Sequence, residues 1–205
     1  MIDVSVVVRP GTPEWPGDTP YSCGWSWSMA EGASVNVSTI TTSPHVGTHA
    51  DAPLHVRDGW PGSESLPLDA FIGPAVVIGV ESARGTLEYE AIADRIPTGT
   101  VRLLLRTGRT IADGRFPDAW PALSAECASR LAEGGLRLLG VDAPSVDERE
   151  STTLATHQAL FGRDAYVLEN LDLRAVPDGL HHLVALPLRL DGLDAAPVRA
   201  ILTPI

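Results

Sequence analysis

The chain has few of the features that mark secreted or membrane proteins. It contains only two cysteines, Cys23 and Cys127, and neither has a second cysteine at metal-ligand spacing. The sequence therefore predicts neither a disulfide framework nor a cysteine metal site. The longest apolar runs, such as residues 75–78, are far shorter than a membrane-spanning helix requires. The amino terminus lacks the basic start and apolar stretch of a secretory signal, so we expect a cytoplasmic location.

Basic residues are also scarce. Lysine and arginine together number 15 against 26 aspartates and glutamates, which gives a net charge of −11. Nucleic acids and anionic membrane surfaces are bound through basic patches, and the sequence has no run rich in lysine or arginine. We therefore expect no nucleic-acid partner and no membrane partner, and we interpret the acidity as a contribution to solubility.

Histidine, in contrast, is concentrated in one segment. Three of the six histidines, His45, His49 and His55, lie within residues 45–55 together with Asp51. Neutral imidazole and carboxylate are the usual ligands of zinc and related divalent ions. A glycine and a proline in the segment predict a shaped loop, and a turn must gather the ligands because a helix would point Asp51 away from the histidines. A structural cluster is the alternative, but the histidines and Asp51 are interleaved with only small or apolar residues, which offer these four side chains no further salt-bridge partner.

The remaining pattern is mixed α and β, without internal repeats or linkers. Residues 10–25 are rich in proline and glycine and predict an irregular surface loop. A chain of this length can bury one sizeable core, so we expect a single domain over residues 1–205. Short apolar runs predict strands at residues 2–8, 33–41, 75–80, 101–107, 136–141, 166–168 and 183–188. Caps and glycine stops predict helices from Thr86 to about Ala93, from Ser124 to about Glu133, and from Thr152 or Thr153 to Gly162.

Several short segments carry a resemblance to a known family. Residues 45–55 have the pattern HxGTHxDxPxH and are preceded by Trp15-Pro16-Gly17-Asp18-Thr19. In these, and in segments 43–45, 67–69, 104–107, 140–147 and 185–188, the chain resembles the metal-dependent cyclase-type hydrolase family, and within it the bacterial formamidases. The histidine pattern is shared with isatin hydrolases, so it indicates the superfamily more firmly than the substrate. The short chain and the Trp-Pro-Gly-Asp segment favour the formamidase branch.

The resemblance implies both a fold and an activity. The fold would be α/β, a single swivelling β/β/α-type domain with a β-barrel-like core, usually assembled as a homodimer or higher homo-oligomer. The activity would be that of an arylformamidase, which converts N-formyl-L-kynurenine and water to L-kynurenine and formate in tryptophan degradation by the kynurenine pathway. Two alternatives stay open: another hydrolase of the family, such as an isatin-type lactam hydrolase, and a non-catalytic metal-binding protein.

The resemblance also implies a binuclear metal site. His45, His49 and Asp51 would hold one ion, and His157, Glu169 and a bridging Asp51 would hold the second. A bridging carboxylate suits two like-charged cations about 3.5 to 4 Å apart. From the residues alone, His157 would be a helix-surface histidine and Glu169 a solvated carboxylate. The family implies two zinc ions per subunit, although histidine and carboxylate ligands also accept manganese, cobalt or cadmium.

Two further roles follow from the resemblance. A metal-activated water would attack the formyl carbon while His55 transfers protons. The alternative for His55, a further metal ligand, ranks lower because each ion already has three protein ligands and needs open positions. Trp15 would contact the small aromatic formamide substrate, and the alternative is a loop anchor that packs on the core.

Other candidates stay outside the expected site. Asp142, Ser145 and Asp147 follow a predicted strand, where a carboxylate could orient a ligand histidine through its second ring nitrogen or could simply serve a turn. The four other tryptophans are expected to be structural or to lie at an oligomer contact (Trp25, Trp27, Trp60 and Trp120).

Overall fold

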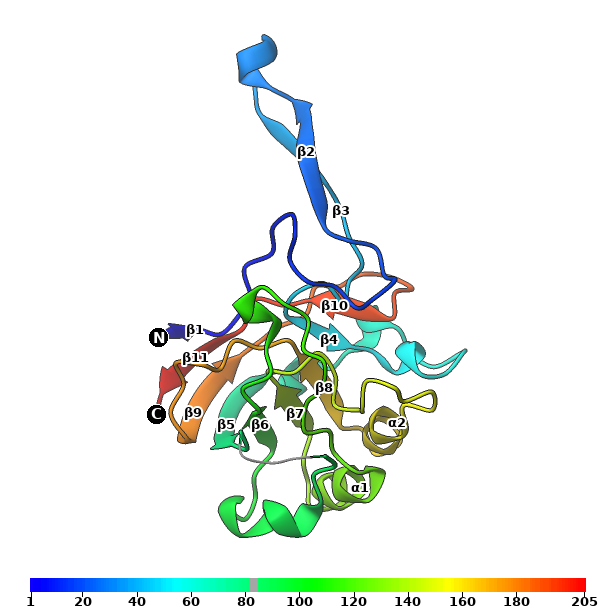
Figure 1. Ribbon diagram of the computed structural model, residues 1–205, viewed down its shortest axis with the longest axis vertical. Coiled ribbons are helices and arrows are strands. Elements are labelled where there is room, and N and C mark those ends of the chain that lie inside the picture. The colour runs from blue at the N-terminus through cyan, green and yellow to red at the C-terminus, as the bar shows by residue number, and fades with distance from the viewer. Residues whose placement is uncertain (82–84) are drawn as a thin grey trace.

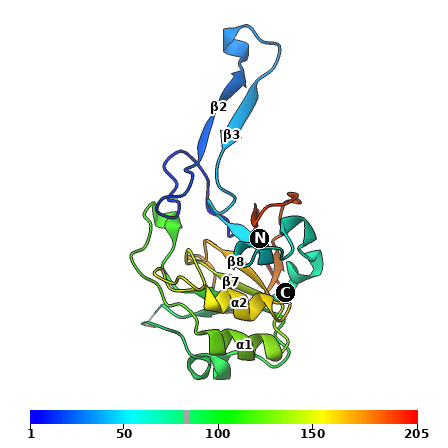
Figure 2. The ribbon, with the colours of Figure 1, turned by 90° about the vertical axis from the view of Figure 1, so that its right-hand side faces the viewer.

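The computed structural model describes residues 1–81 and 85–205. The chain folds into an α/β body from which a long two-stranded hairpin projects (Figures 1 and 2). The body contains a curved nine-stranded sheet with the order β1-β11-β9-β5-β6-β7-β8-β4-β10. Its strands are β1 (Ile2–Asp3), β4 (His49–Asp51), β5 (Ile72–Gly79), β6 (Arg102–Arg106), β7 (Leu138–Val141), β8 (Tyr166–Glu169), β9 (Gly179–Val184), β10 (Ala195–Pro197) and β11 (Ile201–Pro204).

The centre of the sheet is parallel and buried on both faces. Strands β5, β6, β7 and β8 pair in parallel, whereas all other pairs are antiparallel. Side chains alternate along β6, so Leu103 and Leu105 belong to one core cluster while Leu104 belongs to a second cluster. Helices α1 (Ala125–Glu133) and α2 (Ala155–Phe161) contribute to the first cluster. Helix α2 lies beside β8, and α1 packs against α2 (Figure 2). Strands with two covered faces are continuously apolar, which explains why the sequence predicted them well.

Two of the three predicted helices are confirmed. Helix α1 begins after Ser124, whose hydroxyl accepts a hydrogen bond from the Cys127 amide as a capping side chain does. Helix α2 lies where it was predicted, but neither threonine caps it. It begins after Leu154, which has a left-handed backbone with φ of 46°.

The prediction of a helix from Thr86 to Ala93 was wrong. The segment instead contains two short 3-10 helices, Tyr89–Ala91 and Ala93–Arg95. Leu87 forms an isolated parallel bridge with Leu123, and the backbone amide of Leu87 donates to the Ala122 carbonyl. Because this contact holds Leu87 extended, Thr86 cannot cap a helix there.

Several strand boundaries also differ from the prediction. The predicted strand 2–8 is a strand only at Ile2–Asp3, and Ser5 adds an isolated bridge to Leu171. The predicted strand 183–188 is displaced to Gly179–Val184, since Pro187 has no amide hydrogen to continue the ladder. Within residues 1–81 and 85–205, no helix has the length and apolar character to span a bilayer.

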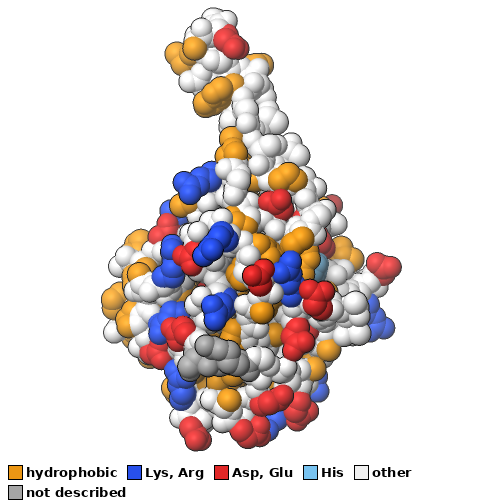
Figure 3. Space-filling model, in the orientation of Figure 1, with side chains coloured by type: hydrophobic (Ala, Val, Ile, Leu, Met, Phe, Trp, Pro, Cys, Tyr) orange, Lys and Arg blue, Asp and Glu red, His pale blue; other side chains and the backbone are white. Residues whose placement is uncertain are grey.

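The projecting hairpin consists of β2 (Ser22–Trp27), β3 (Val37–Thr41) and a 3-10 helix, Met29–Glu31, near its tip. Strand β3 was predicted, whereas β2 begins inside the segment expected to be an irregular loop. Every residue of both strands is exposed, and apolar side chains are visible along the hairpin in Figure 3. A lone two-stranded hairpin is marginally stable in water, and this one leaves large apolar side chains exposed outside the core.

Candidate metal centre

The histidine-rich segment enters the sheet as a strand. His45 lies in the turn before β4, as expected, but residues 49–51 form a strand where a loop was predicted. Side chains two positions apart on a strand point to the same side, so His49 and Asp51 share one face. Strand β4 lies between β8 and β10, and the pairing places His49 opposite Glu169 and Asp51 opposite Ala195.

The ring of His49 is oriented by its own turn. Its Nδ1 lies 2.9 Å from the Gly47 carbonyl oxygen. Because a carbonyl only accepts hydrogen bonds, Nδ1 carries the proton of this hydrogen bond, and Nε2 is the ring nitrogen that faces Asp51. Gly47 has a φ of 79°, and a Cβ there would lie 2.4 Å from the Val8 side chain. Glycine is therefore required at the position that sets the ring.

One group of ligand atoms converges on Asp51. Its Oδ1 lies 3.1 Å from His45 Nδ1 and 3.2 Å from His49 Nε2. His49 Nε2 and Asp51 Oδ1 are nevertheless buried without a hydrogen-bond partner among the described residues. Leaving buried polar atoms unpaired costs about 1 to 3 kcal/mol each, so such atoms are uncommon. Their convergence fits a divalent cation, which all three groups can ligate.

A second group lies on the other side of Asp51. His157 Nε2 is 3.2 Å from Asp51 Oδ2 and 3.3 Å from Glu169 Oε1. The other ring nitrogen of His157 lies 2.6 Å from Asp147 Oδ2, and Asp147 also accepts hydrogen bonds from the Thr156 and His157 amides. Asp147 therefore both caps the start of α2 and orients His157, the contact that sequence analysis considered for this carboxylate.

Glu169 adjoins both groups. Its Oε1 accepts a hydrogen bond from the Val146 amide at 2.8 Å, and its Oε2 lies 3.7 Å from His49 Nε2. The sequence prediction assigned Asp51 alone as the bridge. In the structure, Asp51 and Glu169 both lie between His49 and His157. Asp142, in contrast, accepts hydrogen bonds from Thr107 and Gly108 and serves a turn.

The two groups strongly shift one another's pKa values. Burial opposes the charged form of Asp51, but the charge of His49, the hydrogen bond from His157 and the nearby ring of His45 hold its pKa well below the usual value. Burial likewise disfavours the charged form of His157, but Asp147, Asp51 and Glu169 outweigh it and raise its pKa. For His45, burial is outweighed by Asp194 and Asp51, which raise the pKa to about 10. Without metal, protons on these histidines neutralise the carboxylates, and a cation would replace them.

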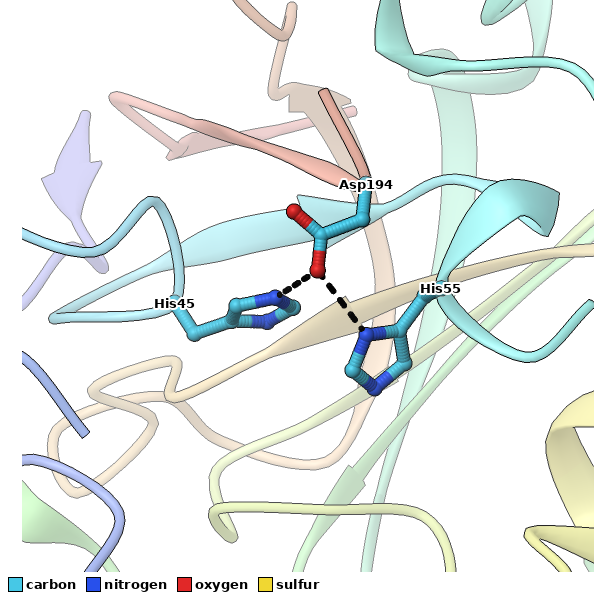
Figure 4. Close-up of side chains that lie close together, drawn as sticks. All are labelled: His45, His55 and Asp194. Carbon is cyan, nitrogen blue, oxygen red and sulfur yellow. Dashed lines mark hydrogen bonds and ion pairs between the residues drawn. The ribbon is translucent and has the colours of Figure 1, made fainter. Parts of the chain in front are cut away.

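An outer group faces the solvent side of the site. His55 ends the 3-10 helix Pro53–His55, and Asp194 precedes β10. One oxygen of Asp194, Oδ2, lies 2.8 Å from His45 Nε2 and 3.3 Å from His55 Nδ1 (Figure 4). Asp194 was not predicted as a site residue, because no local sequence pattern distinguishes it from the other aspartates. Only the pairing of β10 with β4 brings it to the site.

A cavity of about 440 Å³ opens above these groups and has an aromatic wall. Trp15 and Phe116 line it together with His45, His55 and other site residues. The ring of Trp15 makes edge contacts with Phe116 at 5.4 Å and with Trp120 at 5.9 Å between centroids. Trp120 is buried and donates its indole hydrogen to the Asp147 carbonyl, as expected for a structural tryptophan.

Comparison with known proteins identifies the class. Residues 2–148 match the family described as Putative cyclase, and the chain belongs to this family. A Bacillus cereus relative named kynurenine formamidase is 42% identical over 204 residues, which cover 100% of this chain and 97% of the relative. The family and the α/β fold class predicted from the sequence are confirmed.

Solved structures share the complete fold. A potential metal-dependent hydrolase with cyclase activity is 29% identical, with a TM-score of 0.85 and coverage of 98% of this chain and 96% of the other. Isatin hydrolase A from Labrenzia aggregata, bound to benzyl benzoate, is 25% identical with a TM-score of 0.81. The match covers 99% of this chain and 93% of the isatin hydrolase chain. The sheet and the helices described above thus share the fold of these solved hydrolase structures.

Proposed function

We propose that the chain is an arylformamidase that converts N-formyl-L-kynurenine and water to L-kynurenine and formate in tryptophan degradation. Relatives named kynurenine formamidase match over the full length at 42% identity. The observation that carries the proposal is the pair of ligand groups that share Asp51 beneath a cavity with an aromatic wall. Such a site suits a small aromatic substrate with a hydrolysable amide.

The proposed cofactor is a pair of zinc ions per chain. His45, His49 and Asp51 would hold one ion, and Asp51, His157 and Glu169 would hold the other. The ligand atoms within each group all lie within 4.8 Å of one another. When bound, such cations lower the pKa of a water molecule and polarise a carbonyl oxygen. The fully buried Asp51 and the nearby Glu169 supply the negative charge that two cations require.

His55 is proposed as the catalytic acid and base. Its Nδ1 faces Asp194, and its ring borders the cavity, so Nε2 remains for the substrate. In the reaction a bond forms between the water oxygen and the formyl carbon, and the bond from that carbon to the arylamine nitrogen breaks. His55 would take the proton from water and deliver it to the departing nitrogen.

Trp15 is proposed to contact the aromatic ring of the substrate. Its side chain lines the cavity and is 37% exposed, so part of the ring is free for a ligand. Its edge contacts to Phe116 and Trp120 fix the orientation of that ring. The anchoring contacts and the proposed substrate contact are therefore compatible.

Hydrolysis of a lactam is the second candidate, because the isatin hydrolase structure matches nearly the entire chain. The two candidates are separated by kcat/KM for N-formyl-L-kynurenine and for isatin, measured on one zinc-loaded preparation. We expect a clear preference for N-formyl-L-kynurenine. A higher kcat/KM for isatin would assign the chain to the lactam hydrolases.

We further propose a homodimer in the cytoplasm. Cys23 and Cys127 are both free, in keeping with a reducing compartment.

The hairpin exposes Trp25, Trp27 and Ile40, each more than 60% accessible. Between residues 20 and 44 the only charged side chain is that of Glu31. A nearly uncharged arm lets two copies with a net charge of −11 meet without strong repulsion, which favours a second copy of this chain as the partner.

Light scattering coupled to size-exclusion chromatography tests the homodimer. The native chain should elute with the mass of a dimer. The double variant Trp25→Ser, Ile40→Ser should elute as a folded monomer, whereas Val7→Ser, at an exposed apolar side chain outside the hairpin, should remain dimeric. A monomeric native chain would refute the homodimer.

A further inference from the structure

Asp194 connects the proposed metal site with the proposed catalytic histidine. A single oxygen, Oδ2, lies within hydrogen-bond distance of His45 Nε2 and of His55 Nδ1 (Figure 4). The position of Asp194 is fixed by the backbone: its carbonyl accepts a hydrogen bond from the Ala52 amide at 2.8 Å, and the next residue, Ala195, pairs with Asp51. Asp194 is therefore held beside β4, the strand that carries His49 and Asp51.

The contacts determine which nitrogen of each ring carries a proton. A carboxylate oxygen accepts hydrogen bonds and has no hydrogen to donate, so each ring nitrogen that faces Oδ2 is the donor. His45 must then donate from Nε2, which leaves Nδ1 directed at Asp51. His55 must donate from Nδ1, which leaves the lone pair of Nε2 for the cavity. The hydrogen bond made by one ring nitrogen generally sets the role of the other.

We infer that Asp194 is a positioning residue that sets His45 for metal binding and His55 for proton transfer through one shared oxygen. The His55 half of this inference rests on the proposed formamidase activity, whereas the His45 half concerns metal affinity alone. Carboxylates that orient ligand histidines typically contribute 10- to 100-fold to metal affinity or activity. A carboxylate that orients a catalytic imidazole likewise fixes its tautomer.

The test compares Asp194→Ala and Asp194→Asn with the control Asp191→Asn, at an exposed aspartate of the same loop. We expect Asp194→Ala to weaken zinc binding by about 10- to 100-fold in chelator competition, and to lower kcat at saturating zinc by about 10- to 100-fold with little change in KM. Asn keeps an acceptor oxygen, so Asp194→Asn should be milder and serves if the alanine variant fails to fold. Asp191→Asn should match the native chain.

Coupling to His55 gives a sharper result. If Asp194 acts through His55, the double variant Asp194→Ala, His55→Ala should be no slower at saturating zinc than His55→Ala alone. Losses that multiply would overturn the inference, as would a kcat of Asp194→Ala equal to that of the native chain. Loss of one whole zinc ion from Asp194→Ala at saturating zinc would identify a ligand instead and would also overturn it.

A measurement without substrate separates this inference from the proposed function. Nitrogen-15 NMR of the histidine rings should show His55 protonated on Nδ1 in the native chain and on Nε2 in Asp194→Ala. If the native chain fails to hydrolyse N-formyl-L-kynurenine, the proposed function fails, but the His55 tautomer and the zinc affinity still decide the role of Asp194. An unchanged tautomer would refute it.

Discussion

The inner and outer side chains of the site differ in exposure, and the difference separates two kinds of chemistry. The inner side chains of Asp51, His157 and Glu169 are at most 5% exposed. The outer side chains of His45, His55 and Asp194 are between 19% and 41% exposed. The buried set is suited to retaining cations, because water has little access to compete for its ligand atoms. In the open set, His45 is a proposed metal ligand, whereas His55 is suited to exchanging protons with substrate and solvent.

The inner set should give the largest effect. Asp51→Ala should abolish the binding of both zinc ions and almost all activity, because this carboxylate contributes to both ligand groups. Elemental analysis of the purified variant gives the metal content, and hydrolysis of N-formyl-L-kynurenine gives the activity. Asp58→Ala, at an exposed position near the same segment, should behave as the native chain. Full zinc stoichiometry in Asp51→Ala would contradict a shared ligand.

Within the outer set, substitution of His55 should lower turnover and leave the metal bound. His55→Ala should lower kcat by about 10² to 10⁴-fold, the usual contribution of acid and base catalysis, with zinc content unchanged. His182→Ala, on β9, is the control. If His55→Ala lost one zinc ion, His55 would be a ligand. If the native chain bound zinc but showed no turnover to lose, the chain would be a non-catalytic metal-binding protein.

The raised pKa values of two site histidines predict that the stability of the metal-free protein depends on pH. The pKa of His45 is raised to about 10 and that of His157 is raised as well, so both keep protons that unfolded histidines release near pH 6.5. Their contribution to stability is complete below about pH 6.5 and is lost as the pH rises toward the folded pKa values. Urea denaturation of chelated protein should thus give a decreasing free energy of unfolding from pH 6.5 to 10. In the variant His45→Gln, the free energy of unfolding should decrease less over the same pH range. Equal slopes for the variant and the native chain would contradict the assignment of this pH dependence to His45.

The smallest effect is expected for substitution of Trp15, which lines the cavity and is not a proposed metal ligand. Trp15→Ala should raise KM for N-formyl-L-kynurenine by about two- to tenfold with kcat nearly unchanged, which corresponds to the 0.5 to 1.5 kcal/mol of an aromatic contact. Trp15→Phe, which keeps a ring, should show a smaller increase. An unchanged KM together with a lower melting temperature would make Trp15 an anchor only.

The sequence was most informative where the site residues are neighbours in the chain. His45, His49, Asp51 and His55 stand out by density alone, and the central strands stand out because they are buried on both faces. His157 and Glu169 were selected by family resemblance, since a helix histidine and a strand-end carboxylate are unremarkable by themselves. The pairing of β4 with β8 accounts for the approach of Glu169 to Asp51. His157 reaches Asp51 from helix α2, which packs against β8.

The parts that sequence analysis missed depend on distant pairing. Asp194 reaches the site only because β10, three residues long, pairs with β4, which is equally short. A strand of this length is too short to show a recognisable alternation of apolar and polar residues. Strand β2 was missed because the prolines and glycines before it indicate a loop. Its own residues do alternate as in a strand, with Cys23, Trp25 and Trp27 at every second position.

The central claim is that two cations held through the shared Asp51 support formamide hydrolysis. It is tested most directly by removing metal with a chelator, adding zinc back in measured equivalents, and following hydrolysis of N-formyl-L-kynurenine. The account predicts no activity without metal and a rate that rises until two zinc ions are bound per chain. Activity that persists after complete chelation, or that is already maximal with one ion per chain, would contradict it.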